Sequence, residues 1–383
     1  MSALGFGNNA MMKVLVFVGT RPEAIKLAPV VQELKNFPES FSVKVCSTGQ
    51  HKEMLAQVFS DFEFFPDISL NVMTNDQSLS SLTSKLFEGI SQVLLEEKPD
   101  WIIIQGDTTT VMVASLCAYY YKISVAHIEA GLRSFNKWSP FPEEMNRRLV
   151  SVMADLHFAP TKASSANLVQ EGIDPAKIVV SGNTGIDALF WVLSRYENHE
   201  LGFSESMSEL LDSKRNFFLI TGHRRENLES GLSNLCEAIK TLADRYPDFY
   251  FVYPVHLNPR VQKTVFELLG ENERILLCDP LPYRQFVKLM SSCFAIITDS
   301  GGIQEESLAL KKPVLVVRAE TERPEGVEAG GSLLVGTQVE GIVSAAEELI
   351  VNKNFYESMT LTANPYGDGN SASIIIDELR SHL

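Results

Sequence analysis

The chain has 383 residues, of which 45% are hydrophobic and 21% charged, a globular composition with enough apolar side chains for two cores. Its formal net charge of −15 argues against general binding to nucleic acid or to an anionic membrane surface. An anionic substrate would therefore need a local cluster of basic side chains.

The five cysteines are scattered and form no C-x-x-C pair, which favours reduced thiols and a cytoplasmic location. The first residues carry no signal-peptide pattern, and no segment approaches the roughly 20 apolar residues that span a bilayer. Residues 1–12 are expected to form an extension ahead of the first strand.

Strand and helix patterns alternate along the chain, which is typical of α/β folds with parallel sheets. The expected strands are 13–18, 42–47, 101–104, 123–126, 156–158, 177–180, 216–221, 249–253, 275–278, 295–298 and 314–317. The expected helices are 23–35, 52–59, 78–97, 109–120, 144–153, 164–171, 228–246, 260–269, 283–290, 302–310, 341–351 and 371–383.

This pattern predicts two Rossmann-like parallel-sheet domains that face a cleft, an arrangement of the GT-B type. The first domain is expected at 13–181 and the second at 182–365, with the C-terminal helix 366–383 crossing back to the first. The polar stretch 195–214 is interpreted as a surface insertion or as the lead into the second domain.

Three carboxylates follow or begin elements in the first domain. Asp107 and Glu129 are each expected at the carboxyl end of a buried strand, three residues after its last expected residue, and Glu143 precedes an expected helix. Ligands bind at the carboxyl ends of strands in open α/β sheets, and converging carboxylates have separated pKa values that suit proton transfer. The alternative for Asp107 and Glu143 is a helix-capping role.

Other candidate motifs also lie at strand–helix junctions. Residues 19–23, Gly-Thr-Arg-Pro-Glu, are followed by Lys26 at a helix start, where unpaired N–H groups favour phosphate. The alternatives are that Pro22 only starts the helix and that Arg21 and Lys26 are solvated. No G-x-G-x-x-G occurs after a strand, which argues against NAD.

Residues 299–306 carry Ser300, Gly301 and Gly302 and are consistent with a diphosphate cradle, or else with a plain turn capped by Ser300. Glu306 either accepts hydrogen bonds from a ribose or faces water. Residues 221–227 hold a cationic cluster around His223, or a solvated edge, and the irregular loop 318–330 suggests function. No motif has metal-ligand spacing, and no metal is expected.

Seven motifs together, in this order, resemble the non-hydrolysing UDP-N-acetylglucosamine 2-epimerases, from about Met12 to the C-terminus. The motifs are residues 19–26, 106–110, 127–133, 142–147, 222–226, 299–306 and 321–325.

The resemblance implies a GT-B-like enzyme that interconverts UDP-GlcNAc and UDP-ManNAc and supplies ManNAc for surface polysaccharide. The family is thought to eliminate UDP to a 2-acetamidoglucal intermediate and to add it again, without a cofactor, and homodimers are implied. Asp107, Glu129 and Glu143 would be the acid/base carboxylates, and His223 would assist the leaving diphosphate. The implied UDP-binding residues are Arg21, Lys26, Leu281, Phe286, Ser300, Gly301, Gly302, Glu306 and Arg323.

The chain also departs from the family pattern. Gln105 stands where many relatives have His, and residues 307–310 differ from a commoner Ala-Pro-Ser-Leu; neither departure is expected to touch a proposed catalytic group. Some bacterial members are activated by UDP-GlcNAc at an adjoining site. The chain matches that possible regulatory site at Gln50, His51 and His256 but has Glu53 and Asp76 where Gln and Arg are expected, so weaker activation is predicted.

Three other functions stay open at this stage. A GT-B glycosyltransferase would share the fold and the UDP cradle, although it would not need three carboxylates and it requires an acceptor. An epimerase of a modified sugar, such as a uronic acid derivative, lies within the same resemblance. A non-catalytic UDP-sugar sensor is disfavoured by the intact acid/base residues.

Overall fold

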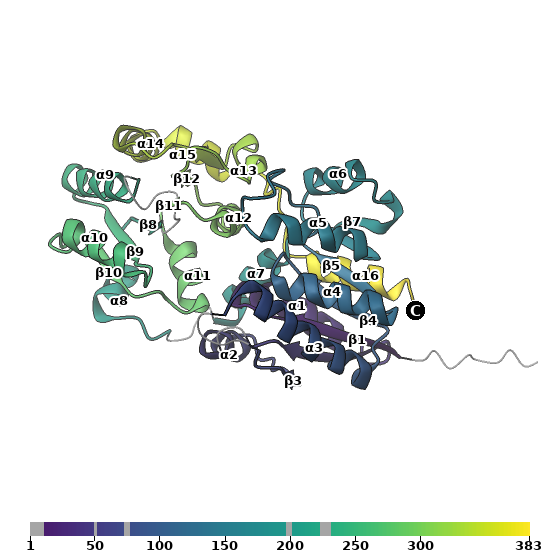
Figure 1. Ribbon diagram of the computed structural model, residues 1–383. Helices are drawn as coiled ribbons and strands as arrows, with labels where there is room; N and C mark the ends of the chain where they lie inside the picture. Colours follow the sequence, from purple (N-terminus) through teal and green to yellow (C-terminus); the bar gives the residue numbers. More distant parts are fainter. Residues whose placement is uncertain (1–10, 50–51, 73–76, 197–200, 223–230) are drawn as a thin grey trace, which may run out of the picture. The chain divides into compact units, whose positions relative to one another are not determined.

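The computed structural model describes residues 11–49, 52–72, 77–196, 201–222 and 231–383. The chain divides into two compact units (Figure 1). Unit 1 contains the chain up to Trp191 together with Tyr366–Leu383, and unit 2 is Val192–Pro365. Among the described helices, none combines the length and the apolar composition that a membrane span requires.

In the described residues, unit 1 is built on a seven-stranded sheet of order β3-β2-β1-β4-β5-β6-β7, and each of its strand pairs is parallel. Its strands are β1 (Met12–Val18), β2 (Phe41–Ser47), β3 (Ile68–Ser69), β4 (Trp101–Gln105), β5 (Ser124–Ile128), β6 (Leu156–Ala159) and β7 (Ile178–Val180). Its helices are α1 (Arg21–Lys35), α2 (Lys52–Asp61), α3 (Leu79–Glu97), α4 (Thr109–Tyr121), α5 (Glu143–Met153), α6 (Lys162–Gln170), the 3-10 turn η1 (Pro175–Lys177) and α16 (Ser371–Arg380), and α7 (Thr184–Tyr196) runs from unit 1 into unit 2.

The core of unit 1 follows the two-residue period of its central strands. Leu15 and Phe17 of β1 and Ile102 and Ile104 of β4 are fully buried and pack against α3 and α4. Helices α3, α4 and α5 lie next to one another in the chain and in space (Figure 1). This packing fixes α5, which begins at Glu143, beside the carboxyl ends of β4 and β5.

Unit 2 has a six-stranded sheet in its described residues, of order β10-β9-β8-β11-β12-β13, again with parallel pairs. The strands are β8 (Phe217–Thr221), β9 (Tyr250–Pro254), β10 (Ile275–Cys278), β11 (Ala295–Thr298), β12 (Val314–Val316) and β13 (Ser332–Leu334). The helices are α8 (Glu205–Asp212), α9 (Gly231–Arg245), α10 (Pro259–Leu269), α11 (Tyr283–Ser292), α12 (Gly301–Ala309), α13 (Pro324–Glu328), α14 (Val339–Val351) and α15 (Lys353–Thr360). Its core includes the stacked rings of Phe218 and Phe251, with centroids 5.5 Å apart.

The predicted fold class, two Rossmann-like parallel-sheet domains, is confirmed by these two sheets. Several elements of the structure were not predicted from the sequence: β3, β13, η1, α7, α8, α13 and α15. Within the polar stretch 195–214, α8 buries only Met207 and Leu210. Two apolar residues among polar neighbours give a weak helical pattern, which explains why this segment resembled an insertion.

Candidate active site

The carboxyl ends of β4 and β5 are tied together by main-chain and side-chain bonds. Gln105 ends β4 in register with Ile128 of β5. Gly106, at φ +83°, donates from its N–H to the Ile128 carbonyl at 3.0 Å. Its own carbonyl lies 2.8 Å from Nε2 of the buried His127. The left-handed backbone at Gly106 turns the chain so that Asp107 follows directly after the sheet edge.

Glu129 follows β5 in a left-handed conformation, with φ +64°. Such a backbone is strained for a residue with a side chain, and strain of this kind clusters at functional sites. The Glu129 side chain is 9% exposed, and its Oε2 accepts from both Lys26 Nζ of α1 and Gln105 Nε2. The charged and amide donors together favour an ionised, fixed carboxylate.

The prediction that the Gln105 departure touches no proposed catalytic group is wrong, because the Gln105 amide bonds to Glu129 directly. Sequence spacing did not reveal this contact, since it depends on the register of β4 against β5. Lys26, which the resemblance assigns to UDP, forms its ion pair with the same carboxylate.

Glu23 supports the turn between β1 and α1. The Thr20–Glu23 capping box starts α1, and Glu23 Oε2 accepts from the Gly19 N–H at 2.6 Å and the Thr20 N–H at 3.3 Å. Burial raises the pKa of Glu23 to about 7, although these hydrogen bonds oppose the shift. The turn that leads to Arg21 is therefore fixed by hydrogen bonds from its main-chain N–H groups to the buried carboxyl group of Glu23.

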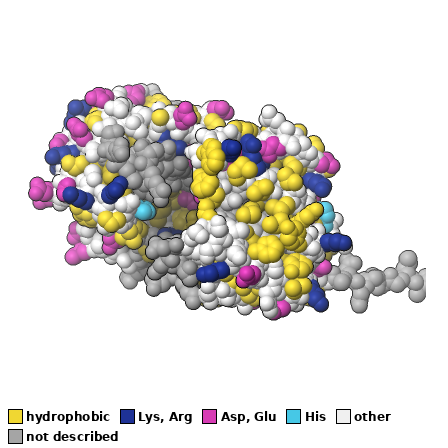
Figure 2. Space-filling view, in the orientation of Figure 1, with side chains coloured by type: hydrophobic (Ala, Val, Ile, Leu, Met, Phe, Trp, Pro, Cys, Tyr) yellow, Lys and Arg dark blue, Asp and Glu magenta, His cyan; other side chains and the backbone are white. Residues whose placement is uncertain are grey.

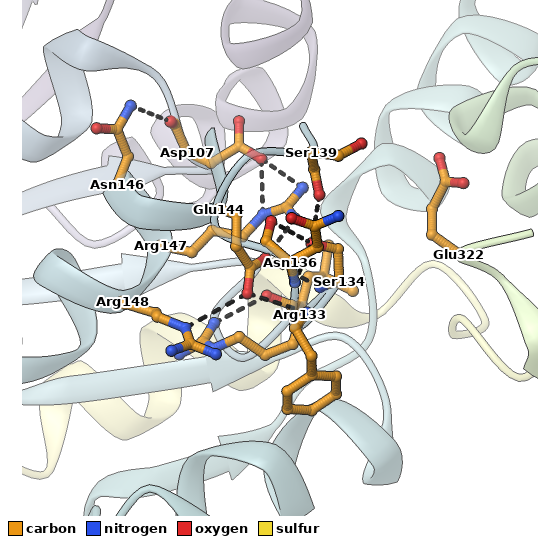
Figure 3. Close-up of polar contacts among 12 residues, drawn as sticks. Asp107, Arg133, Ser134, Asn136, Ser139, Glu144, Asn146, Arg147, Arg148 and Glu322 are labelled. Carbon is orange, nitrogen blue, oxygen red and sulfur yellow. Dashed lines mark hydrogen bonds and ion pairs between the residues drawn. The ribbon is translucent and has the colours of Figure 1, made fainter. Parts of the chain in front are cut away.

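Asp107 is held by helix α5 (Figure 3). Arg147 donates to Asp107 Oδ2 from Nε at 2.9 Å and from its second terminal nitrogen at 2.7 Å. Asn146 Nδ2 donates to the Asp107 main-chain carbonyl at 2.8 Å. The buried Glu144 accepts from the Ser134 N–H at 2.9 Å and lies 3.4 Å from Arg147. These contacts of Glu144, Asn146 and Arg147 on α5 were not predicted from the sequence.

The helix-capping alternative does not hold for Asp107; Glu143 is not the N-cap of its helix but meets the alternative in part, as an acidic residue in the first turn of α5. The N-cap of α4 is Thr108, whose side chain accepts from the Val111 N–H, and the N-cap of α5 is Pro142. Glu143 is the first helical residue of α5 and is half-buried. At that position its carboxylate lies at the positive end of the helix dipole.

Among the predicted UDP-binding residues of unit 2, Ser300, Gly301, Gly302 and Glu306 lie at the start of α12 or within it, and Arg323 contacts α12 through Glu305. Ser300 is the N-cap, but its side chain makes no capping bond, so the simple capping alternative is not met. A Cβ added at Gly302 would meet no described atom within 4 Å. Tyr283 OH donates to Glu306 Oε1 at 2.9 Å, and Arg323 forms an ion pair with the buried Glu305.

The sequence of the whole chain decides its family. A sequence model of the family described as UDP-N-acetylglucosamine 2-epimerase matches residues 32–380. The chain belongs to the UDP-N-acetylglucosamine 2-epimerase family. It is thereby placed among the isomerases, and the resemblance stated from the motifs is confirmed.

Relatives match over nearly their full length. The UDP-N-acetylglucosamine 2-epimerase of Yersinia pestis is 46% identical over 374 residues, which cover 97% of this chain and 99% of the relative. The structure of the Neisseria meningitidis UDP-GlcNAc 2-epimerase bound to UDP-GlcNAc has a TM-score of 0.88 and 46% identity, with 97% and 100% coverage. That of the Methanocaldococcus jannaschii enzyme in complex with UDP-GlcNAc and UDP has a TM-score of 0.80 and 35% identity, also with 97% and 100% coverage.

The structure gives the positions of four more of the predicted site residues. Arg21 is the first residue of α1, Leu281 is half-buried ahead of α11, and Phe286 is half-buried on α11. The exposed His256 follows β9, and its Nδ1 accepts from the Asn258 N–H at 3.1 Å. The predictions for His223, Gln50, His51 and Asp76 and for the Glu53 side chain fall outside the described residues.

Proposed function

We propose that the protein catalyses the reversible C2 epimerisation of UDP-GlcNAc to UDP-ManNAc. The observation that carries this proposal is the family match over most of the chain together with a set of carboxylates held at the ends of β4 and β5. The N. meningitidis relative binds UDP-GlcNAc, and the M. jannaschii relative binds both UDP-GlcNAc and UDP.

The mechanism that we propose is elimination of UDP to 2-acetamidoglucal followed by re-addition. The proton on C2 is weakly acidic, so its removal must accompany cleavage of the C1–O bond. Re-addition then places a proton on the opposite face of C2. Because two faces exchange protons, the chemistry needs more than one acid/base group, and Asp107, Glu129 and Glu143 supply three.

Their surroundings give each carboxylate a different character. Glu129 accepts from Lys26 and Gln105, an arrangement that favours its ionised form. Asp107 is fixed by Arg147 and is 26% exposed, which leaves it accessible to a ligand. Glu143 stands at the start of α5. We assign acid/base roles to all three and leave the order of their proton transfers to experiment.

We propose that the residues of unit 2 bind the nucleotide. The α12 N-terminus offers N–H groups and a positive dipole to a diphosphate, and the space beside Gly302 admits a ligand close to the backbone. Arg323 contributes positive charge, Glu306 is an acceptor for ribose hydroxyls, and Leu281 and Phe286 offer apolar surface to uracil. His223 is assigned to the departing diphosphate, where a cation stabilises developing negative charge.

Incubation of the purified protein with UDP-GlcNAc alone, followed by proton NMR, tests this function. Formation of UDP-ManNAc without an acceptor supports the proposal, whereas consumption of UDP-GlcNAc only after an acceptor is added would indicate a glycosyltransferase. Turnover of a uronic acid derivative in preference to UDP-GlcNAc would indicate an epimerase of a modified sugar. The product would serve as a ManNAc donor for surface polysaccharide.

We further propose that the protein is a homodimer through the outer face of α5. Phe141, Met145, Leu149 and Val152 recur at helical spacing and are exposed, Val152 at 82%. Figure 2 shows hydrophobic side chains gathered over the part of unit 1 that carries α4 and α5. A monomer rarely exposes a continuous apolar stripe of this kind, and a two-fold copy of the same stripe would cover it.

A further inference from the structure

Arg147 connects the proposed catalytic Asp107 to a buried anchor, Glu144 (Figure 3). We propose that Arg147 is a positioning residue: it fixes the Asp107 carboxylate through one oxygen and leaves the other for the sugar. This inference rests on the acid/base role proposed for Asp107. No such role follows from the motifs, in which Arg147 was only part of a matching pattern.

The geometry at Asp107 supports a positioning role. Two nitrogens of the Arg147 guanidinium, at 2.9 and 2.7 Å, contact the same atom, Oδ2. Among the described residues, Oδ1 accepts no hydrogen bond. The planar guanidinium fork therefore restricts rotation of the carboxylate while one oxygen stays available to exchange a proton.

The backbone of Asp107 is held by the residue next to Arg147. The Asn146 amide donates to the Asp107 carbonyl at 2.8 Å. Consecutive residues of α5 thus hold the side chain and the main chain of Asp107. Displacement of this helix turn would move the whole of Asp107, whereas loss of the Arg147 guanidinium would free only its carboxylate.

Glu144 fixes the other side of the arginine. Its carboxylate is fully buried and accepts from the N–H groups of Ser134, at 2.9 Å, and Phe135, at 3.2 Å. Arg147 and Arg148 each lie 3.4 Å from it. A buried carboxylate with several donors is held in one orientation, so it provides a rigid anion against which Arg147 is set.

The neighbouring Arg148 provides a matched control. It lies in the same helix turn, carries the same charge and pairs with the same Glu144, but its side chain is 40% exposed and it makes no contact with Asp107 among the described residues. Replacement of either arginine removes a partner of Glu144. Only replacement of Arg147 releases the carboxylate of Asp107.

The test compares steady-state epimerisation by Arg147→Ala, Arg147→Lys and Arg148→Ala. Arg147→Ala should lower kcat by about 100-fold with KM changed by less than about three-fold, since a small misplacement of a reacting group has effects of that size. Arg147→Lys should recover part of kcat, and Arg148→Ala should stay within about two-fold of wild type. Added ethylguanidinium should restore kcat to Arg147→Ala and leave Arg148→Ala unchanged.

A double-variant cycle shows whether Arg147 acts through Asp107. In the Asp107→Asn background, Arg147→Ala should cause little further loss, because the group that it positions is already gone. The inference would be overturned if the double variant lost kcat by the product of the two single losses. It would also be overturned if Arg147→Ala and Arg148→Ala lost kcat equally and ethylguanidinium restored neither. Should Arg147→Ala fail to fold by circular dichroism, Arg147→Gln takes its place in the same comparisons.

Failure of this inference can be told apart from failure of the proposed function. If Asp107→Asn loses kcat as expected but keeps a measurable rate, and the two losses multiply in the double variant, only the role of Arg147 is refuted. If Asp107→Asn keeps wild-type kcat, the acid/base role of Asp107 is refuted, and the positioning role of Arg147 falls with it.

Discussion

The Gln105 side chain donates a hydrogen bond to Oε2 of Glu129, the same oxygen that pairs with Lys26. An amide does not titrate in the physiological range, so this contact keeps one geometry as pH changes. The Gln105 amide therefore fixes the orientation of the Glu129 carboxylate, and the Lys26 ammonium stabilises its negative charge.

Replacement of Gln105 by Ala should therefore lower kcat by about ten-fold or more, the scale of a hydrogen bond to a charged group, with a smaller change in KM. The control is Gln92→Ala, since Gln92 donates to Glu96 at 2.7 Å on the exposed surface of α3. Steady-state kinetics on both variants check this, and an unchanged kcat for Gln105→Ala would exclude a role for the contact.

Acid should destabilise unit 1 through His127. Burial lowers the pKa of His127 to about 3, whereas the unfolded side chain titrates near 6.5. Between these values only the unfolded state binds the proton, so the free energy of unfolding falls as pH falls. From pH 7 to pH 5 the loss should be about 2 kcal/mol for this group.

His127→Gln should show a smaller loss on acidification than wild type, because Gln can donate to the Gly106 carbonyl without titrating. Denaturant unfolding at pH 7 and pH 5 measures the difference. The buried His157, whose pKa is also lowered by burial, to about 4, contributes to both proteins and cancels in the comparison. His256→Gln, at an exposed position, serves as a control, and identical losses for His127→Gln and wild type would contradict the assignment.

The proposed homodimer makes a prediction about α5. A charge placed in its exposed stripe, as in Val152→Glu, should convert the dimer to a monomer, since a buried unpaired carboxylate is costly in an interface. Analytical ultracentrifugation of wild type and variant measures the oligomeric state. The control is Val351→Glu, because Val351 is also exposed but lies on α14, outside the stripe of α5. A wild-type sedimentation coefficient that fits a monomer at all concentrations would rule the dimer out.

The substitutions at Glu53 and Asp76 predict weak activation by UDP-GlcNAc. The rate against UDP-GlcNAc should be less sigmoidal than in regulated relatives, and the reverse reaction from UDP-ManNAc should start without added UDP-GlcNAc. The test measures initial rates from UDP-ManNAc with and without a trace of UDP-GlcNAc. An absolute requirement for the added nucleotide sugar would refute the prediction.

The strands β10 and β11 match the bounds expected from sequence, and most other expected elements lie within a few residues of theirs, whereas the 13-residue helix α7 was missed. These strands are continuous apolar runs flanked by polar turns, so local pattern is enough to find them. The two-residue β3 and the amphipathic α8 were missed because their burial depends on tertiary partners. The contacts of Gln105 and Arg147 were missed for a related reason: both join segments far apart in sequence, and only strand register and helix packing bring them together.

Replacement of the three carboxylates tests their proposed roles. Asp107→Asn, Glu129→Gln and Glu143→Gln should each lower kcat by roughly two or more orders of magnitude, the usual scale for loss of acid–base catalysis. UDP should still bind each variant, because the contacts proposed for the nucleotide in unit 2 are unchanged. Calorimetric titration with UDP measures that binding, and a variant that keeps wild-type kcat would remove its residue from the mechanism.

The proposed mechanism, elimination and re-addition, moves the C2 proton through side chains of the protein. The most direct measurement is NMR of UDP-GlcNAc incubated with the wild-type protein in D2O. A carboxylic acid on the protein exchanges its proton with solvent, so each epimerisation should place deuterium at C2 of the product. Product that retains protium fully at C2 would contradict elimination and re-addition and indicate a direct hydride or keto-intermediate route.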